Sequence, residues 1–156
     1  MRTINVKAIF DRYKVRTLND TIFDTIRKKY VHLTPEEIVR QKAIKYLIKR
    51  LEVPADRIIV ERSLNSLGVN GNKKRIDIGV LDDNGLLMAV VECKAFLPHN
   101  DETAFIQAQD YLFELNARYF FVTDGYTFGG YYYDKFQFIR LEEIPTFEKW
   151  HYCPYP

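Results

Sequence analysis

The sequence is poor in cysteine and contains no long apolar run. Only two cysteines, Cys93 and Cys153, occur among 156 residues, and they lie far apart in the chain. That count fits neither a disulfide framework nor a cysteine-rich zinc site, so we expect a reducing, cytoplasmic environment. No apolar stretch approaches the roughly 18 residues of a membrane helix, and the N-terminal stretch MRTINVKAIFDRYKVR lacks the apolar region of a secretion signal.

The sequence also lacks a phosphate-binding loop of the form G-x-x-x-x-G-K-[ST], so we expect this chain to bind no nucleotide. It has no internal repeat and no low-complexity tract. The formal net charge is only +2, so any basic surface that recognises nucleic acid must come from local clustering. Hydrophobic residues make up 47% of the chain, which is enough for one globular domain with one core.

Hydrophobic patterns indicate a mixed α/β chain. A helix should begin after Thr34, where TPEE supplies an N-cap, a proline at the first helical position and Glu37 at the capping-box position; it should end before Pro54. Residues 19–30 suggest a short helix. The later elements are strands at 57–64, 75–81 and 86–94, a helix at 101–116, a strand at 118–123, and one or two extended segments within 130–141. This order predicts a mixed sheet covered by helices.

The third predicted strand ends in charged side chains. Its apolar run, residues 89–91, is followed by Glu92 and Lys94 on either side of Cys93. Isolated charges are costly to bury, so charges in such a strand are usually paired or bind a metal. Because strand side chains alternate, Glu92 and Lys94 should share one face and Cys93 should point to the other.

The neighbouring strand supplies a second carboxylate. If DDNG forms the hairpin turn, Leu81 pairs with Leu86, and Asp77 falls opposite Val90 on the face of Glu92. Two carboxylates about 7 Å apart can share a Mg²⁺ or Mn²⁺ ion, which prefers few carboxylates, several waters and a substrate phosphate. A lysine one pleat further on can contact the scissile phosphate or the attacking water. This is the chemistry of metal-assisted phosphodiester hydrolysis.

The combination of an Asp on one strand and x-[DE]-x-Lys on the next resembles the PD-(D/E)XK nuclease superfamily. More narrowly, the chain is similar to the N-terminal nuclease domain of type I restriction enzyme R subunits. The matching stretches are, in order, LTPEEIVRQ, KKRIDIGV, VVECKA, QAQDY and YFFVTDG. They span about residues 33–125 of a single expected domain, 1–156, with an N-terminal extension at 1–32 and a C-terminal strand and extension at 126–156.

The resemblance implies an α/β fold (an α+β mixed sheet) with a restriction-endonuclease-like core, and the activity of a DNA endonuclease that uses Mg²⁺ or Mn²⁺. The active-site Asp, Glu and Lys of the family match Asp77, Glu92 and Lys94, and the two carboxylates would hold the metal. The Gln of the family's Q-x-x-x-Y motif matches Gln107. A further helical Glu matches Glu37.

The expected partners are DNA and motor or methyltransferase subunits supplied in trans. R subunits carry helicase-like ATPase domains after this module, whereas this chain ends at Pro156, so we expect the module to stand alone. The family's usual Thr-Asn-Gly turn reads Thr123-Asp124-Gly125 here, which adds a negative charge near the phosphate site. The candidate DNA contacts are Arg40, Gln41, Lys73, Lys74, Arg75 and Tyr111.

Each of these residues also has a purely structural interpretation. The Asp77, Glu92 and Lys94 set could be a salt bridge on a half-exposed sheet face, because short motifs produce false matches. Glu37 could be a capping residue alone, and Gln107 could bond only to backbone. The three functions that stay open are a nuclease, a non-cleaving nucleic-acid- or protein-binding domain of the same fold, and an interaction domain with a structural ion cluster.

Overall fold

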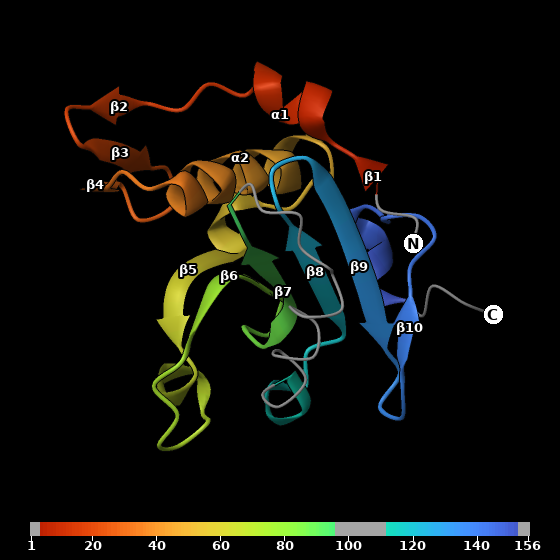
Figure 1. Ribbon diagram of the computed structural model, residues 1–156. Coiled ribbons are helices and arrows are strands. Elements are labelled where there is room, and N and C mark those ends of the chain that lie inside the picture. Colours follow the sequence, from red (N-terminus) through yellow and green to blue (C-terminus); the bar gives the residue numbers. More distant parts are fainter. Residues whose placement is uncertain (1–3, 96–111, 153–156) are drawn as a thin grey trace.

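A mixed seven-stranded sheet forms the centre of the fold, and helix α2 (Pro35–Lys49) packs against it (Figure 1). This computed structural model describes residues 4–95 and 112–152. The strand order is β1-β9-β8-β7-β6-β5, and β10 pairs with β9. In chain order the strands of this sheet are β1 (Ile4–Asn5), β5 (Ile58–Ser63), β6 (Arg75–Leu81), β7 (Leu87–Cys93), β8 (Tyr119–Thr123), β9 (Thr127–Tyr133) and β10 (Phe138–Arg140).

Helix α2 begins as its sequence predicts. The Thr34 side chain accepts a hydrogen bond of 3.1 Å from the backbone N–H of Glu37, and Pro35 occupies the first turn. Such an N-cap stabilises a helix by about 1 kcal/mol. The helix ends at Lys49, before Pro54, and it buries Val39, Ala43, Ile44, Tyr46 and Leu47 against the sheet.

Strands β5, β6 and β7 form the predicted antiparallel meander, and β8 then runs parallel to β7. The predicted pairing of Leu81 with Leu86 is wrong, because Leu81 lies opposite Leu87 and the register shifts between Val80 and Leu81. The turn itself causes the shift: the Asp82 side chain accepts hydrogen bonds from turn N–H groups, including that of Leu86, and so draws Leu86 into the turn.

The short helix predicted at residues 19–30 is also wrong. This segment contributes to a separate three-stranded sheet, β2 (Thr17–Leu18), β3 (Thr21–Asp24) and β4 (Lys29–His32), which follows helix α1 (Lys7–Arg12). The fully buried Asp24 decides the outcome, since its Oδ1 accepts hydrogen bonds from the N–H groups of Ile26 and Arg27. An aspartate that bonds to nearby backbone in this way favours a turn over a helix.

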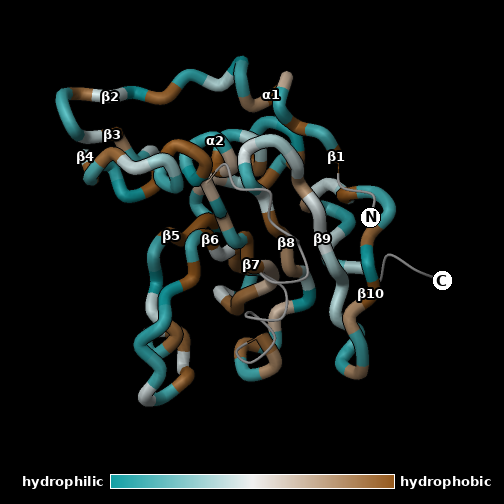
Figure 2. Tube along the Cα trace, in the orientation of Figure 1, coloured by the Kyte–Doolittle hydropathy of each residue, from teal (hydrophilic) through white to brown (hydrophobic). Residues whose placement is uncertain are grey.

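The core lies on both faces of the main sheet. On the α2 side, aromatic residues such as Phe121 and Phe128 pack with Trp150 from the short 3-10 helix η3 (Phe147–His151). A second cluster, which includes Val90 and Phe120, covers the other side. The chain's most hydrophobic stretches run along the central strands (Figure 2). Two further 3-10 turns, η1 (Ala55–Arg57) and η2 (Asn65–Leu67), flank β5.

The second predicted helix, residues 101–116, lies outside the described residues from 101 to 111. Within the described part, residues 112–115 are helical. Leu112 in this turn is buried against the second cluster. Among residues 4–95 and 112–152, no helix combines the length and apolar character required to cross a membrane.

Candidate active site

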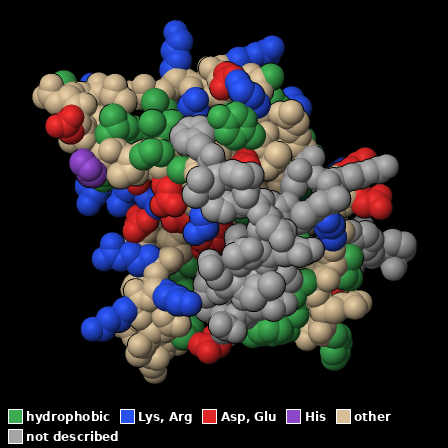
Figure 3. All heavy atoms as spheres, viewed as in Figure 1, with side chains coloured by type: hydrophobic (Ala, Val, Ile, Leu, Met, Phe, Trp, Pro, Cys, Tyr) green, Lys and Arg blue, Asp and Glu red, His purple; other side chains and the backbone are tan. Residues whose placement is uncertain are grey.

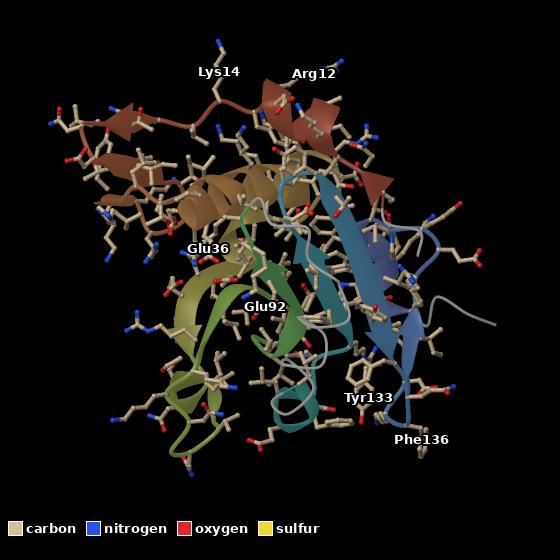
Figure 4. The ribbon with its side chains drawn as sticks, viewed as in Figure 1. Arg12, Lys14, Glu36, Glu92, Tyr133 and Phe136 are labelled. Atoms are coloured by element: carbon tan, nitrogen blue, oxygen red, sulfur yellow. The ribbon has the colours of Figure 1, made fainter. Side chains whose placement is uncertain are left out.

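Asp77 and Glu92 lie on neighbouring strands. Ile78 of β6 pairs with Val91 of β7, and Asp77 and Glu92 are the next residues along the two strands beyond this pair. Figure 4 shows Glu92 on β7 in the region below α2. Asp77 Oδ2 accepts a hydrogen bond of 2.8 Å from the N–H of Cys93, so β7 fixes the orientation of the Asp77 carboxylate.

The other oxygen of Asp77 meets a buried arginine from α2. Arg40 Nη2 donates to Asp77 Oδ1 at 2.8 Å and to Glu61 Oε1 at 2.5 Å. Its Nη1 donates to the carboxylate of Glu37 on the same helix. The Arg40 side chain is only 7% exposed. One guanidinium therefore joins three carboxylates from α2, β5 and β6.

Burial and charge act in opposite directions on this cluster. For Arg40, burial alone would lower the pKa, but the carboxylates of Asp77, Glu37 and Glu61 outweigh burial and raise the pKa above its ordinary value. For Glu37 the balance is different. Burial raises the pKa of its carboxyl group, and the opposing effect of Arg40 does not cancel that increase.

The N-terminal sheet is attached to the same cluster. Gln41 Nε2 donates to Glu37 Oε1 at 3.3 Å, while Gln41 Oε1 accepts from the N–H of Thr25 at 3.2 Å. Arg27 approaches Glu37 Oε1 at 3.5 Å and pairs with the buried Asp24 at 2.7 Å. Residues outside the matched core thus help to fix the acidic end of α2.

Glu61 is a member of this cluster that sequence reasoning did not single out. It lies within β5 with a φ of 54°, a backbone conformation that non-glycine residues rarely adopt. Its Oε1 bonds to Arg40, and its Oε2 lies 3.5 Å from Arg75. Glu61 could have been found in the sequence as a glutamate that directly follows the apolar run of a core strand. The same pattern identified Glu92.

Lys94 directly follows β7. It is half-buried, and its N–H donates a hydrogen bond of 2.9 Å to the carbonyl of Thr123 at the end of β8. This bond connects Lys94 to β8, the strand that runs parallel to β7. Two further candidates, Gln107 and Tyr111, lie outside the described residues.

The candidate DNA contacts divide into two groups. Arg40 and Gln41 are only 6% and 1% exposed, so the structure places both inside the protein. The basic residues Lys73, Lys74 and Arg75 are exposed at the β5–β6 hairpin. In the face shown in Figure 3, acidic side chains lie beside α2, and lysine and arginine side chains project around them.

The Thr123-Asp124-Gly125 turn uses its extra carboxylate locally. Asp124 Oδ1 accepts hydrogen bonds from the N–H groups of Tyr126 and Thr127, at 2.8 and 2.7 Å. The Asp124 carboxylate is therefore directed at the backbone of its own turn.

The donor chemistry of Asp77 and Glu92 suits Mg²⁺, because hard divalent cations prefer carboxylate oxygens. Both Asp77 oxygens already have partners in this structure, Arg40 and the Cys93 N–H. Across residues 4–95 and 112–152, no group of three or more Asp, Glu, His or Cys side chains is assembled as a metal cage. The residue types thus fit a divalent cation, and the Arg40 guanidinium bonds to one of the oxygens that such a cation would use.

Together these features define a class of protein. A helix with an acidic first turn packs on an antiparallel meander, which continues into a parallel strand, and this is the α+β arrangement of nuclease-like folds. The chain belongs to the family of type I restriction enzyme R protein N termini, whose model matches residues 35–145. No curated protein matches the chain.

Proposed function

We propose that this protein is a Mg²⁺- or Mn²⁺-dependent DNA endonuclease module. The observation that carries the proposal is that the Asp77 carboxylate bonds both to Arg40 of α2 and to the N–H of Cys93, the residue between Glu92 and Lys94. Membership of the R protein N-terminal family supports a nuclease-related role. On this proposal DNA is the substrate, and other subunits of a restriction complex are the partners.

Each site residue has a defined role in this proposal. Asp77 and Glu92 hold the divalent cation, which when bound polarises the scissile phosphate and activates water. Lys94 places its ammonium group beside the phosphate, and the backbone bond to Thr123 fixes its position. Glu37 keeps a negative charge at the helix end of the site, and Gln107, which lies outside the described residues, is assigned a further polar contact.

Plasmid nicking tests the proposal. Wild type incubated with supercoiled plasmid and Mg²⁺ or Mn²⁺ should produce nicked circles, whereas Lys94→Ala should not. Lys149→Ala, at an exposed lysine in η3, is the matched control and should cut like wild type. The proposal is wrong if Lys94→Ala nicks plasmid as well as wild type does. It is also wrong if wild type nicks no plasmid with either metal.

Binding to DNA is tested separately by charge reversal at the hairpin. Lys73→Glu with Lys74→Glu should weaken binding to all sequences alike and flatten the salt dependence by about one unit per lost phosphate contact. The control is Lys135→Glu with Lys149→Glu, which changes the net charge equally but lies away from the β5–β6 hairpin. If both pairs of changes have the same effect, the hairpin is not the contact.

A second candidate function is a non-cleaving nucleic-acid- or protein-binding domain of the same fold. The observation in its favour is that Arg40 already neutralises Asp77, as an ion pair with a purely structural role would. This candidate predicts DNA or protein binding that is independent of Mg²⁺ and unchanged by Lys94→Ala. Binding measured with and without a chelator distinguishes it from the nuclease.

A further inference from the structure

Three carboxylates converge on the guanidinium of Arg40, deep in the candidate site. Glu37 bonds to Nη1, and Glu61 and Asp77 share Nη2, at 2.5 and 2.8 Å. The Arg40 Nε atom is buried and has no hydrogen-bond partner among the described residues. The guanidinium is therefore held by its two outer nitrogens alone, and its orientation is set by the carboxylates.

These three carboxylates are balanced in formal charge by three arginines. Arg40 bonds to all three of them, and Arg27 and Arg75 lie 3.5 Å from Glu37 and Glu61. A cation that joins the cluster at Asp77 therefore has to displace a positive group rather than fill a charge deficit.

Asp77 is the carboxylate at which the guanidinium and a metal would meet. Its Oδ2 is held by the N–H of Cys93 and its Oδ1 by Arg40. A cation that binds Oδ1 has to replace the guanidinium, since two positive groups cannot occupy the same ligand position. Glu37 bonds to the other outer nitrogen of Arg40, and Glu61 also bonds to Nη2, so these two carboxylates can keep the charge of Arg40 satisfied after it leaves Asp77.

We propose that Arg40 is a positioning residue that competes with the divalent cation for Asp77. Without metal, Arg40 holds the Asp77 carboxylate in place and neutralises it. When metal binds, Arg40 releases Asp77 and remains paired with Glu37 and Glu61. The inference rests on the proposed metal-dependent function, and it identifies a residue that sets the metal affinity of the site without touching the metal.

Calorimetric titration with Mn²⁺ tests the competition directly. Arg40→Gln removes the competitor and should bind Mn²⁺ about tenfold more tightly than wild type, because the cation no longer displaces a positive charge. Arg75→Gln also removes a positive partner of Glu61, but from an exposed position, and should change the affinity by less than about twofold. Equal or weaker binding by a folded Arg40→Gln variant overturns the proposal.

A second measurement uses wild type and does not depend on the stability of that variant. Arginine Nε–H resonances are followed by ¹⁵N NMR during a Mg²⁺ titration, and the Arg40 signal is assigned by its loss in Arg40→Lys. This signal should shift in step with metal binding. The Arg57 signal, whose side chain pairs with Asp83 away from the site, should not. An unchanged Arg40 signal at saturating Mg²⁺ overturns the proposal.

Neither measurement relies on cleavage, so the nuclease function and the competition between Arg40 and the metal can be tested independently. If plasmid is not nicked but the Arg40 signal shifts and Arg40→Gln binds Mn²⁺ more tightly, the competition stands and the nuclease function fails. If plasmid is nicked and Mn²⁺ binding is the same with and without Arg40, the nuclease stands and the competition fails. Absence of Mn²⁺ binding in both proteins also overturns the competition.

Discussion

The two halves of helix α2 are both buried, but with opposite chemistry. The first turns bury Glu37, Arg40 and Gln41, which bond to one another and to neighbouring elements. The later turns bury Ile44 and Leu47, which are 0% exposed within the apolar core. One helix thus carries an ionic end and an apolar end against the same body of the protein.

The two ends contribute to stability in different ways. Full burial of a leucine or isoleucine contributes about 1.5–3 kcal/mol, so the apolar end holds the helix in place. Buried ion pairs lose about as much in desolvation as they gain in attraction, so the ionic end adds little net stability. A well-packed apolar end would stabilise the fold at least as well. The ionic end is therefore where function is to be sought.

The largest expected effect on stability comes from breaking the ionic end. Arg40→Gln leaves three carboxylates, each no more than about a quarter exposed, without their shared cation. Removing one partner of a buried pair typically costs about 3–5 kcal/mol. Urea unfolding in the presence of a chelator measures the loss. A loss below about 1 kcal/mol would mean that water already screens the cluster.

A substitution in the apolar end should lower the free energy of unfolding slightly less than Arg40→Gln does. Leu47→Ala creates a cavity beside a fully buried position and should lower the free energy of unfolding by about 3 kcal/mol. The difference between the ends appears on addition of Mn²⁺. Bound metal should recover stability in Arg40→Gln more than in Leu47→Ala, because tighter binding gives a larger linked stabilisation. Equal recovery in both variants would remove the distinction between the two ends.

A smaller effect, of opposite sign, is expected at Glu92. Glu92→Gln removes one of two like charges on adjacent strands, so stability should stay equal or rise by up to about 1 kcal/mol while plasmid nicking is lost. Glu148→Gln, at an exposed position in η3, is the control and should affect neither. A fall of about 3 kcal/mol for Glu92→Gln would instead indicate a structural ion pair.

The elements that the sequence predicted well are those set by local signals. Helix α2 follows from Thr34 and Pro35, and the central strands follow from their apolar runs. The family resemblance was confirmed over residues 35–145. Local patterns carry this information because capping and alternation act within a few residues of one another.

The parts that sequence missed depend on contacts between distant residues. The β6–β7 register depends on how the Asp82 side chain shapes the turn, and the N-terminal sheet depends on a buried Asp24. Most importantly, the convergence of Glu37, Glu61 and Asp77 on Arg40 joins three elements and rests on one guanidinium. No spacing within a single element indicates that arrangement.

The smallest predicted effect is a pH dependence at Glu37. Burial raises the pKa of Glu37 in the folded protein above its ordinary value, against the opposing influence of Arg40. The folded state therefore binds this proton more strongly than the unfolded state does. The resulting stability is fully present below the unfolded-state pKa and is lost as the pH rises through the folded-state pKa.

Glu37→Gln, which resembles a permanently protonated glutamate, isolates this contribution. The stability of wild type minus that of Glu37→Gln should be greatest at and below the unfolded-state pKa of about 4.5 and should decrease toward neutral pH. Urea unfolding of both proteins across this range measures the difference, and Glu36→Gln at the exposed neighbouring position controls for charge at the helix end. If the difference instead increased with pH, pairing with Arg40 would outweigh burial. The ionised end of α2 would then stabilise the fold, and the contrast between the two halves of the helix would disappear.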